Sequence, residues 1–189
     1  MRKHFIIILV LILHGFLISE ETPTDYQVIS GAIYNISKYT TWPGPLDMSK
    51  PFIIGVIGKL PRGEQIYLSR DAAIDKRRVI VKYYSSLEEI KSPEVLFIAS
   101  SEAHRLDEIL KYIEGKPILT IGDTKGFAQK GVIINFYVKG IRECFEVNYD
   151  AYRRSGIQIH SNVLVASGRL IGSKNSQAQE TPRMEKREI

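Results

Sequence analysis

The first regular pattern in the sequence is a helical repeat of apolar residues between Thr24 and Pro43. Thr24 and Gln27 are spaced as a capping box, in which two side chains bond the free backbone N–H groups at a helix start. Pro43-Gly44-Pro45 ends the repeat, because a residue before proline is driven out of the α conformation. The sequence therefore predicts an amphipathic helix whose apolar face is formed by Val28, Ile29, Ala32, Ile33, Ile36 and Tyr39.

Four short apolar runs follow, with polar segments between them. Their interiors are continuous Ile, Val, Leu and Phe rather than alternating, which is typical of parallel strands covered on both faces. The runs are FIIGVIG (52–58), RRVIVKYY (77–84), EVLFIA (94–99) and KPILTIGD (116–123). Two helices are predicted between them, a short one with a capping box of Ser86 and Glu89, and a longer one that follows Ser101 and stops at Gly115.

The alternation of strand and helix changes after residue 130. Two β-type runs, 131–138 and 141–148, flank Lys139-Gly140 and predict a hairpin. A helix is predicted from Asn148 to Gly156, followed by a short apolar segment (156–160) and by a helix over 161–172 capped by Ser161. Together these elements predict an α/β protein, a three-layer α/β/α sandwich with a mixed, mainly parallel sheet and a C-terminal hairpin.

The two ends of the chain differ from this domain. Residues 1–19 begin with two cations and continue with an apolar run from Phe5 to Leu13, the layout of a secretory signal peptide. The run is shorter than the roughly 20 residues of a membrane-spanning helix. Residues 173–189 have almost no apolar side chains and predict a disordered polar tail. The folded domain is therefore expected over 24–172.

Charge and cysteine content narrow the class of protein. The net charge is +5, but Arg2 and Lys3 supply two of these charges, and the sequence has no run of five or more Lys and Arg. A nucleic-acid partner is therefore not expected. Cys144 is the single cysteine, so the chain cannot close an internal disulfide and must be stabilised by its core.

Few polar residues of the sequence suggest catalysis or the binding of a ligand or metal. The sequence lacks the glycine-rich phosphate loop and the dinucleotide fingerprint, and it predicts neither an enzyme nor a bound cofactor or metal. Asn135 interrupts the most apolar strand and is predicted to tie down a neighbouring loop such as GDTKGF, with ligand binding as the alternative. Asp123 ends a strand and is predicted to serve a turn or a helix cap. Both are expected to be structural polar residues.

Trp42 is the only tryptophan, and it stands where the first helix stops. The simplest interpretation is an aromatic lid that packs where the helix turns into the sheet. The alternative is a side chain that stacks on a ligand or contacts a partner.

Several segments resemble YfiR-like proteins, in unchanged order over residues 26–171. They are AIYNISKYTTWP (32–43), FIIGVIG (52–58), EVLFIASSEAHRLDEIL (94–110) and the stretch from PILTIGDTKGF to SNVL (117–164). The resemblance implies an α/β/α sandwich exported to the periplasm of Gram-negative bacteria, which holds a membrane-bound diguanylate cyclase inactive through that enzyme's periplasmic domain. Relatives that respond to oxidation use several cysteines, so a disulfide switch cannot be carried over to a chain that has only Cys144.

The resemblance and the missing catalytic groups together predict a periplasmic regulator that acts by protein–protein contact. Its expected partner is the periplasmic domain of an inner-membrane diguanylate cyclase or sensor kinase, and homodimer formation is left open. The alternative is a small-ligand-binding sensory module whose pocket would use Trp42, Tyr34 or Tyr39. The candidate contacts are apolar residues that follow the complete sheet pattern, although the same stretch could simply pack on the sheet: Ile157, Ile159, Val163, Leu164 and Leu170.

Overall fold

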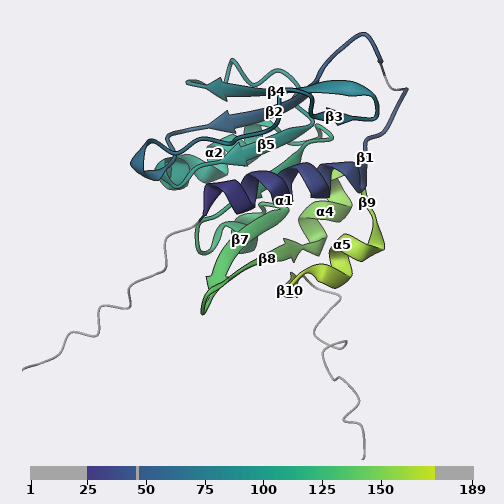
Figure 1. The fold of residues 1–189 in the computed structure, drawn as a ribbon. Helices are drawn as coiled ribbons and strands as arrows, with labels where there is room; N and C mark the ends of the chain where they lie inside the picture. Colours follow the sequence, from purple (N-terminus) through teal and green to yellow (C-terminus); the bar gives the residue numbers. More distant parts are fainter. Residues whose placement is uncertain (1–24, 46, 173–189) are drawn as a thin grey trace, which may run out of the picture.

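The computed structural model describes residues 25–45 and 47–172, which form one eight-stranded sheet with helices on both faces (Figure 1). The strand order is β10-β8-β7-β6-β5-β2-β4-β3. The five central strands from β4 to β7 are parallel to one another, and β3, β8 and β10 run in the opposite direction. The strands are β2 Phe52–Ile57, β3 Ala73–Ile74, β4 Arg77–Tyr84, β5 Val95–Ile98, β6 Leu119–Gly122, β7 Ile134–Lys139, β8 Arg142–Asn148 and β10 Arg169–Ile171. The predicted mixed, mainly parallel sheet is confirmed.

Four of the five α-helices of the described residues lie in connections between strands, and the longest helix, α1, precedes the first strand. Two 3₁₀ turns, η1 Pro61–Gly63 and η2 Ser100–Arg105, accompany them, and η2 leads directly into α2. The α-helices are α1 Tyr26–Lys38, α2 Leu106–Tyr112, α3 Phe127–Lys130, α4 Tyr149–Ser155 and α5 Ser161–Ala166.

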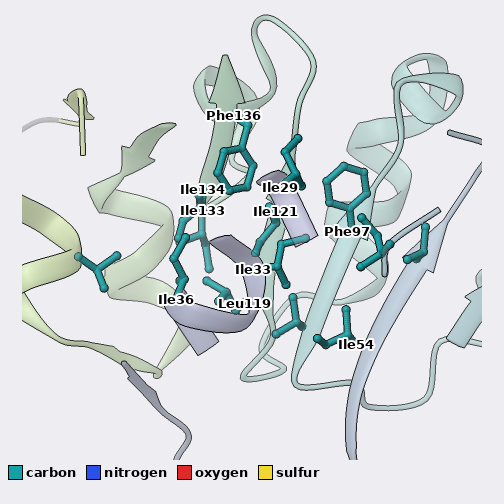
Figure 2. Close-up of a cluster of buried hydrophobic side chains, with 14 of the residues drawn as sticks. Ile29, Ile33, Ile36, Ile54, Phe97, Leu119, Ile121, Ile133, Ile134 and Phe136 are labelled. Carbon is teal, nitrogen blue, oxygen red and sulfur yellow. The ribbon is translucent and has the colours of Figure 1, made fainter. Parts of the chain in front are cut away.

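The main core lies between α1 and one face of the sheet. Ile29, Ile33 and Ile36 are at most 5% exposed and point at the sheet. Figure 2 shows them among the central strand residues Phe97, Leu119, Ile121 and Ile134. Each fully buried side chain of this kind contributes about 1.5–3 kcal/mol to folding.

The apolar face of α1 is narrower than the sequence predicted. Val28 is 50% exposed and Tyr39 is 54% exposed, so both lie outside the core. The reason is geometric. Only one side of α1 faces the sheet, and side chains spaced by three or four residues are enough to cover it.

A second core on the opposite face completes the three layers. There α2 and α3 place Leu106, Ile109 and Phe127 against the sheet. Strand β5 serves both cores, since Val95 and Phe97 point to the α1 side while Leu96 and Ile98 point to the α2 side. Coverage on both faces explains why this strand is continuously apolar in sequence.

The C-terminal part forms the predicted hairpin and then adds two elements. β7 and β8 pair antiparallel with Lys139 opposite Arg142, so the loop is Gly140-Ile141, one residue later than predicted. After α4 the chain reaches the end of α1, where β9 (Gln158–Ile159) pairs antiparallel with β1 (Thr40–Thr41) in a separate two-stranded sheet. It then forms α5 and joins the main sheet as β10, parallel to β8.

Three local predictions are wrong. The N-cap of α1 is Asp25, whose Oδ1 accepts from the Gln27 N–H at 2.9 Å, and Thr24 lies outside the described residues. Residues 85–92 form turns rather than a helix, and Glu89 accepts from the Ser85 N–H at 2.7 Å within that turn.

The third wrong prediction is the helix over 161–172. This helix ends at Ala166, because the Gly168 N–H donates to the Phe145 oxygen at 2.8 Å and draws the chain into the sheet edge. Its N-cap is His160, whose Nδ1 accepts from the Asn162 N–H, rather than Ser161.

The predicted signal peptide (1–19) and polar tail (173–189) lie outside the described residues. Within the described part of the chain, no helix has the length and apolar character needed to span a membrane.

Candidate functional site

Trp42 lies directly after β1, where the chain leaves the end of α1 for the sheet. Its half-buried ring meets the Phe52 ring edge-on, with 5.2 Å between centroids. Its Nε1–H donates to the backbone oxygen of Glu94 at 3.0 Å. These contacts hold the segment after α1 against the amino ends of β2 and β5, at the edge of the main core.

A groove of about 400 Å³, here called the Trp42 groove, opens beside this ring. Its volume is within the range of small-molecule sites, about 300–1,000 Å³. Lys82 and Lys50 are exposed cations on its lining. Much of the remaining lining is proline: Pro43, Pro45, Pro51, Pro93 and Pro117.

A buried ion pair that the sequence analysis missed supports the same groove. The Arg77 and Glu94 side chains are only 8% and 17% exposed, and the guanidinium donates to the carboxylate. Arg77 also donates to the backbone oxygens of Lys50 at 3.1 Å and Pro51 at 2.9 Å. Glu94 in turn accepts from the Ile53 N–H at 2.8 Å. The pair therefore joins the starts of β2, β4 and β5, and its only trace in sequence is a charge at the start of each of two apolar runs.

A second polar pair lies at the carboxyl end of β6. The Tyr26 hydroxyl donates to Asp123 Oδ2 at 2.5 Å and so ties the first turn of α1 to the sheet. Burial raises the pKa of Asp123, although hydrogen bonds from Tyr26 and Thr124 oppose the shift. Burial, followed by the bond to Asp123, also raises the pKa of Tyr26. Asp123 caps no helix, because α3 begins after Gly126 without a side-chain cap.

Asp123→Asn is expected to gain stability relative to wild type as the pH rises from about 4 to about 7. Since the folded protein holds the pKa of Asp123 above its ordinary value of 3.8, the folded state keeps a proton that the unfolded state has already released. Wild-type stability from this group is therefore complete in acid and declines as the pH rises through the folded pKa. The Asn oxygen still accepts from Tyr26 but cannot ionise. Urea unfolding of both proteins at the two pH values measures the difference, and a difference independent of pH would contradict the assignment.

Asn135 is buried as predicted, but it bonds a different group. Its Nδ2 donates to Glu146 Oε1 on the neighbouring strand at 3.4 Å, not to the GDTKGF loop. Glu146 is 4% exposed and pairs with Arg169 of β10 at 3.3 Å. Asn135 Oδ1 has no hydrogen-bond partner among the described residues. The amide thus belongs to a polar row that links β7, β8 and β10.

The C-terminal stretch does not present the apolar surface suggested by the sequence. Ile157, Ile159 and Val163 are at most 7% exposed and belong to the main core, so a partner cannot reach them in this fold. Leu164 and Leu170 are half-buried against the same core. The stretch closes the end of the core because β9 pairs with β1.

The outside of this corner also carries Tyr39, His160 and Val165, which the sequence analysis did not select as partner contacts. Val165 is 84% exposed, because it lies two positions after the inward Val163 and therefore on the opposite side of α5. The Tyr39 and His160 rings lie 6.1 Å apart, and the His160 N–H donates to the Tyr39 oxygen at 2.8 Å. We call this group the α5 surface: Tyr39, His160, Leu164, Val165 and Leu170.

The described residues hold no group of three or more His, Cys, Asp or Glu side chains arranged to bind a metal ion. His104 and Glu108, four residues apart in sequence, therefore have no third ligand of this kind beside them. Cys144 is half-buried on β8, opposite Tyr137.

Comparison with known proteins agrees with this architecture. Nine chains of solved structures match, among them the crystal structure of a conserved domain protein from Vibrio cholerae O1 biovar El Tor strain N16961. That chain is 12% identical with a TM-score of 0.52, and the alignment covers 76% of this chain and 60% of that one. This chain therefore spans about 60% of that protein's length, and the similarity concerns the fold.

No curated protein matches the sequence. A family model described as YfiR/HmsC-like matches residues 26–167, which is most of the chain and nearly all of the described domain. The order of strands and helices above runs through this whole range. The protein therefore belongs to the YfiR/HmsC-like family.

Proposed function

We propose that the protein is an exported regulator that binds the periplasmic domain of an inner-membrane diguanylate cyclase and holds the enzyme inactive. Membership in the YfiR/HmsC-like family carries this proposal, because it supports a periplasmic regulatory role in cyclic di-GMP signalling. A sensor kinase of the inner membrane is the second class of partner compatible with that role.

Repression by binding requires a difference in affinity between two states of the target. A regulator with equal affinity for the active and inactive cyclase shifts nothing, however tightly it binds. Each preference of about 1.4 kcal/mol for the inactive state changes the ratio of the two states tenfold. The regulator needs no catalytic group of its own for this task.

The α5 surface is the contact region that we propose. Val165 and Tyr39 are exposed apolar or aromatic side chains on it, and the buried Ile159 and Val163 beneath them give rigid support. Tyrosine is one of the residue types that anchor protein interfaces, and an exposed apolar side chain such as Val165 adds area that a partner can bury. Leu164 and Leu170, which the sequence suggested, lie half-buried beside these anchors.

Deletion of the gene is expected to raise cellular cyclic di-GMP, measured by mass spectrometry. Val165→Asp should raise it towards the deletion level, because a charge at a buried interface anchor weakens binding at least about tenfold. Ile141→Asp is the matched control, since Ile141 is 93% exposed at the β7–β8 hairpin, away from the α5 surface. Circular dichroism and periplasmic fractionation establish that both variants fold and are exported.

The two parts of this proposal fail in different ways. Unchanged cyclic di-GMP in the deletion strain would exclude the cyclase as the target. A rise on deletion, with wild-type levels in Val165→Asp, would keep the regulator and move its contact away from the α5 surface.

A small-ligand-binding sensory module is the second candidate, and the Trp42 groove favours it. Its volume and its aromatic wall suit a small molecule. A metabolite that raises the melting temperature of wild type but not of a folded Trp42 variant would support this candidate.

A further inference from the structure

We propose that a second groove, formed where α2, α3 and α4 end, binds a small amphipathic anion: a carboxylate or phosphate ester on an apolar body. The groove has a volume of about 580 Å³. It involves neither Trp42 nor the α5 surface, so the proposal stands independently of the proposed function. We call it the basic groove.

Its lining carries four cations and one carboxylate, a net charge of +3. The cations are Lys111, Lys116, Lys130 and Arg154, and the carboxylate is Glu114. Among the described residues, none of these four cations forms an ion pair, whereas four other cations of the protein do. The Lys116 ammonium is held 4.5 Å from the centre of the Tyr112 ring. The groove therefore carries a net positive charge, and its four cations are not engaged in ion pairs with acidic side chains of the described residues.

The helix ends account for only part of this charge. Lys111, Lys130 and Arg154 lie in the last turns of α2, α3 and α4, where cations commonly offset the helix dipole. A helix C-terminus carries at most roughly half a negative charge. Three ends therefore compensate about half of the net charge, and the rest is available to an anion that enters the groove.

The floor of the groove is apolar and rigid. Ile113, Ile118 and Ile133 line it and are at most 5% exposed. The two hydroxyls on the lining already have partners, since Thr120 Oγ1 accepts from the Ile133 N–H at 2.9 Å and Ser155 Oγ donates to the Tyr152 oxygen at 2.7 Å. Polar recognition thus falls to the cations at the rim, while the floor suits an apolar body. A bare inorganic ion would use only the cations at the rim.

The test is a titration of the purified ¹⁵N-labelled protein with phenyl phosphate, inorganic phosphate and phenol. We expect phenyl phosphate to shift the amides of Gly115 and Gly131 with saturation. Inorganic phosphate and phenol should bind at least about tenfold more weakly, because each supplies one half of the recognition. No saturation with phenyl phosphate up to about 10 mM, or equal affinity for inorganic phosphate, would overturn the proposal.

Two neighbouring pairs of cations supply matched variants. Arg154→Gln and Lys130→Gln should each weaken phenyl phosphate binding about tenfold, because each removes a charge-assisted hydrogen bond. Arg153→Gln and Lys125→Gln should change it less than about twofold, since both side chains are exposed but do not line the groove. Equal losses in the two sets would mean that net charge, rather than this groove, attracts the anion, and would also overturn the proposal.

Discussion

Arg77→Ala is expected to lower the free energy of unfolding by about 3–5 kcal/mol, as measured by urea denaturation. The change leaves the Glu94 carboxylate nearly buried without its guanidinium, and breaking one side of a buried pair has a cost of this size. It also removes the donor from the backbone oxygens of the exposed Lys50 and the half-buried Pro51, which directly precede β2. Most of the loss is therefore assigned to the stranded carboxylate.

A double variant separates the stability lost through the unpaired charge from the stability lost through packing. Arg77→Met with Glu94→Gln should recover most of the lost stability, because the neutral amide still accepts from the Ile53 N–H and no charge is buried alone. Arg78→Ala, at the exposed neighbouring position, should change stability by less than about 0.5 kcal/mol. A loss below about 1 kcal/mol for Arg77→Ala would show that the pair does not hold the three strand starts together.

Trp42→Ala should destabilise the protein by about 3 kcal/mol. Truncation of a buried Trp usually costs about 3–5 kcal/mol, and the half-buried ring of Trp42 places it at the lower end. The variant loses the edge-on contact with Phe52 and the hydrogen bond to the Glu94 oxygen. Thermal and urea unfolding, followed by circular dichroism, measure the loss.

Trp42→Phe is the control for the two parts of this loss. It keeps an aromatic ring against Phe52 but removes the Nε1–H donor, so about 1 kcal/mol of the loss should remain. Stability unchanged in Trp42→Ala, together with lost binding of a partner or metabolite, would contradict the packing role and make Trp42 a functional contact.

The fold was largely predictable because its strongest signals are repetitive. Ile29, Ile33 and Ile36 recur at helical spacing, and the central strand 95–98 is apolar on both faces because each face has its own core. Local end signals were less reliable. Ser86 and Glu89 match a capping box, yet Glu89 bonds the Ser85 N–H in a turn, so the same residues satisfy two structures.

The site was harder to predict because its parts meet only through strand order. Arg77 and Glu94 are 17 residues apart in sequence and come together because β4 and β5 both flank β2. The partner of Asn135 is Glu146 in the next strand. Glu146 also pairs with Arg169 of β10, a strand that lies in a segment predicted to be helical. The basic groove likewise gathers the ends of three separate helices.

The position of α1 in the main core also means that its apolar face forms contacts with strands that come much later in the chain. α1 ends at Lys38, whereas β6, which packs beneath it, begins at Leu119, about 80 residues later. Whether the chain emerges from the ribosome or, as proposed, from an export channel, Ile29, Ile33 and Ile36 emerge about 80 residues before these partners. During that interval the helix face offers an apolar binding site to chaperones and to other nascent chains, so the step most exposed to aggregation precedes the completion of the sheet.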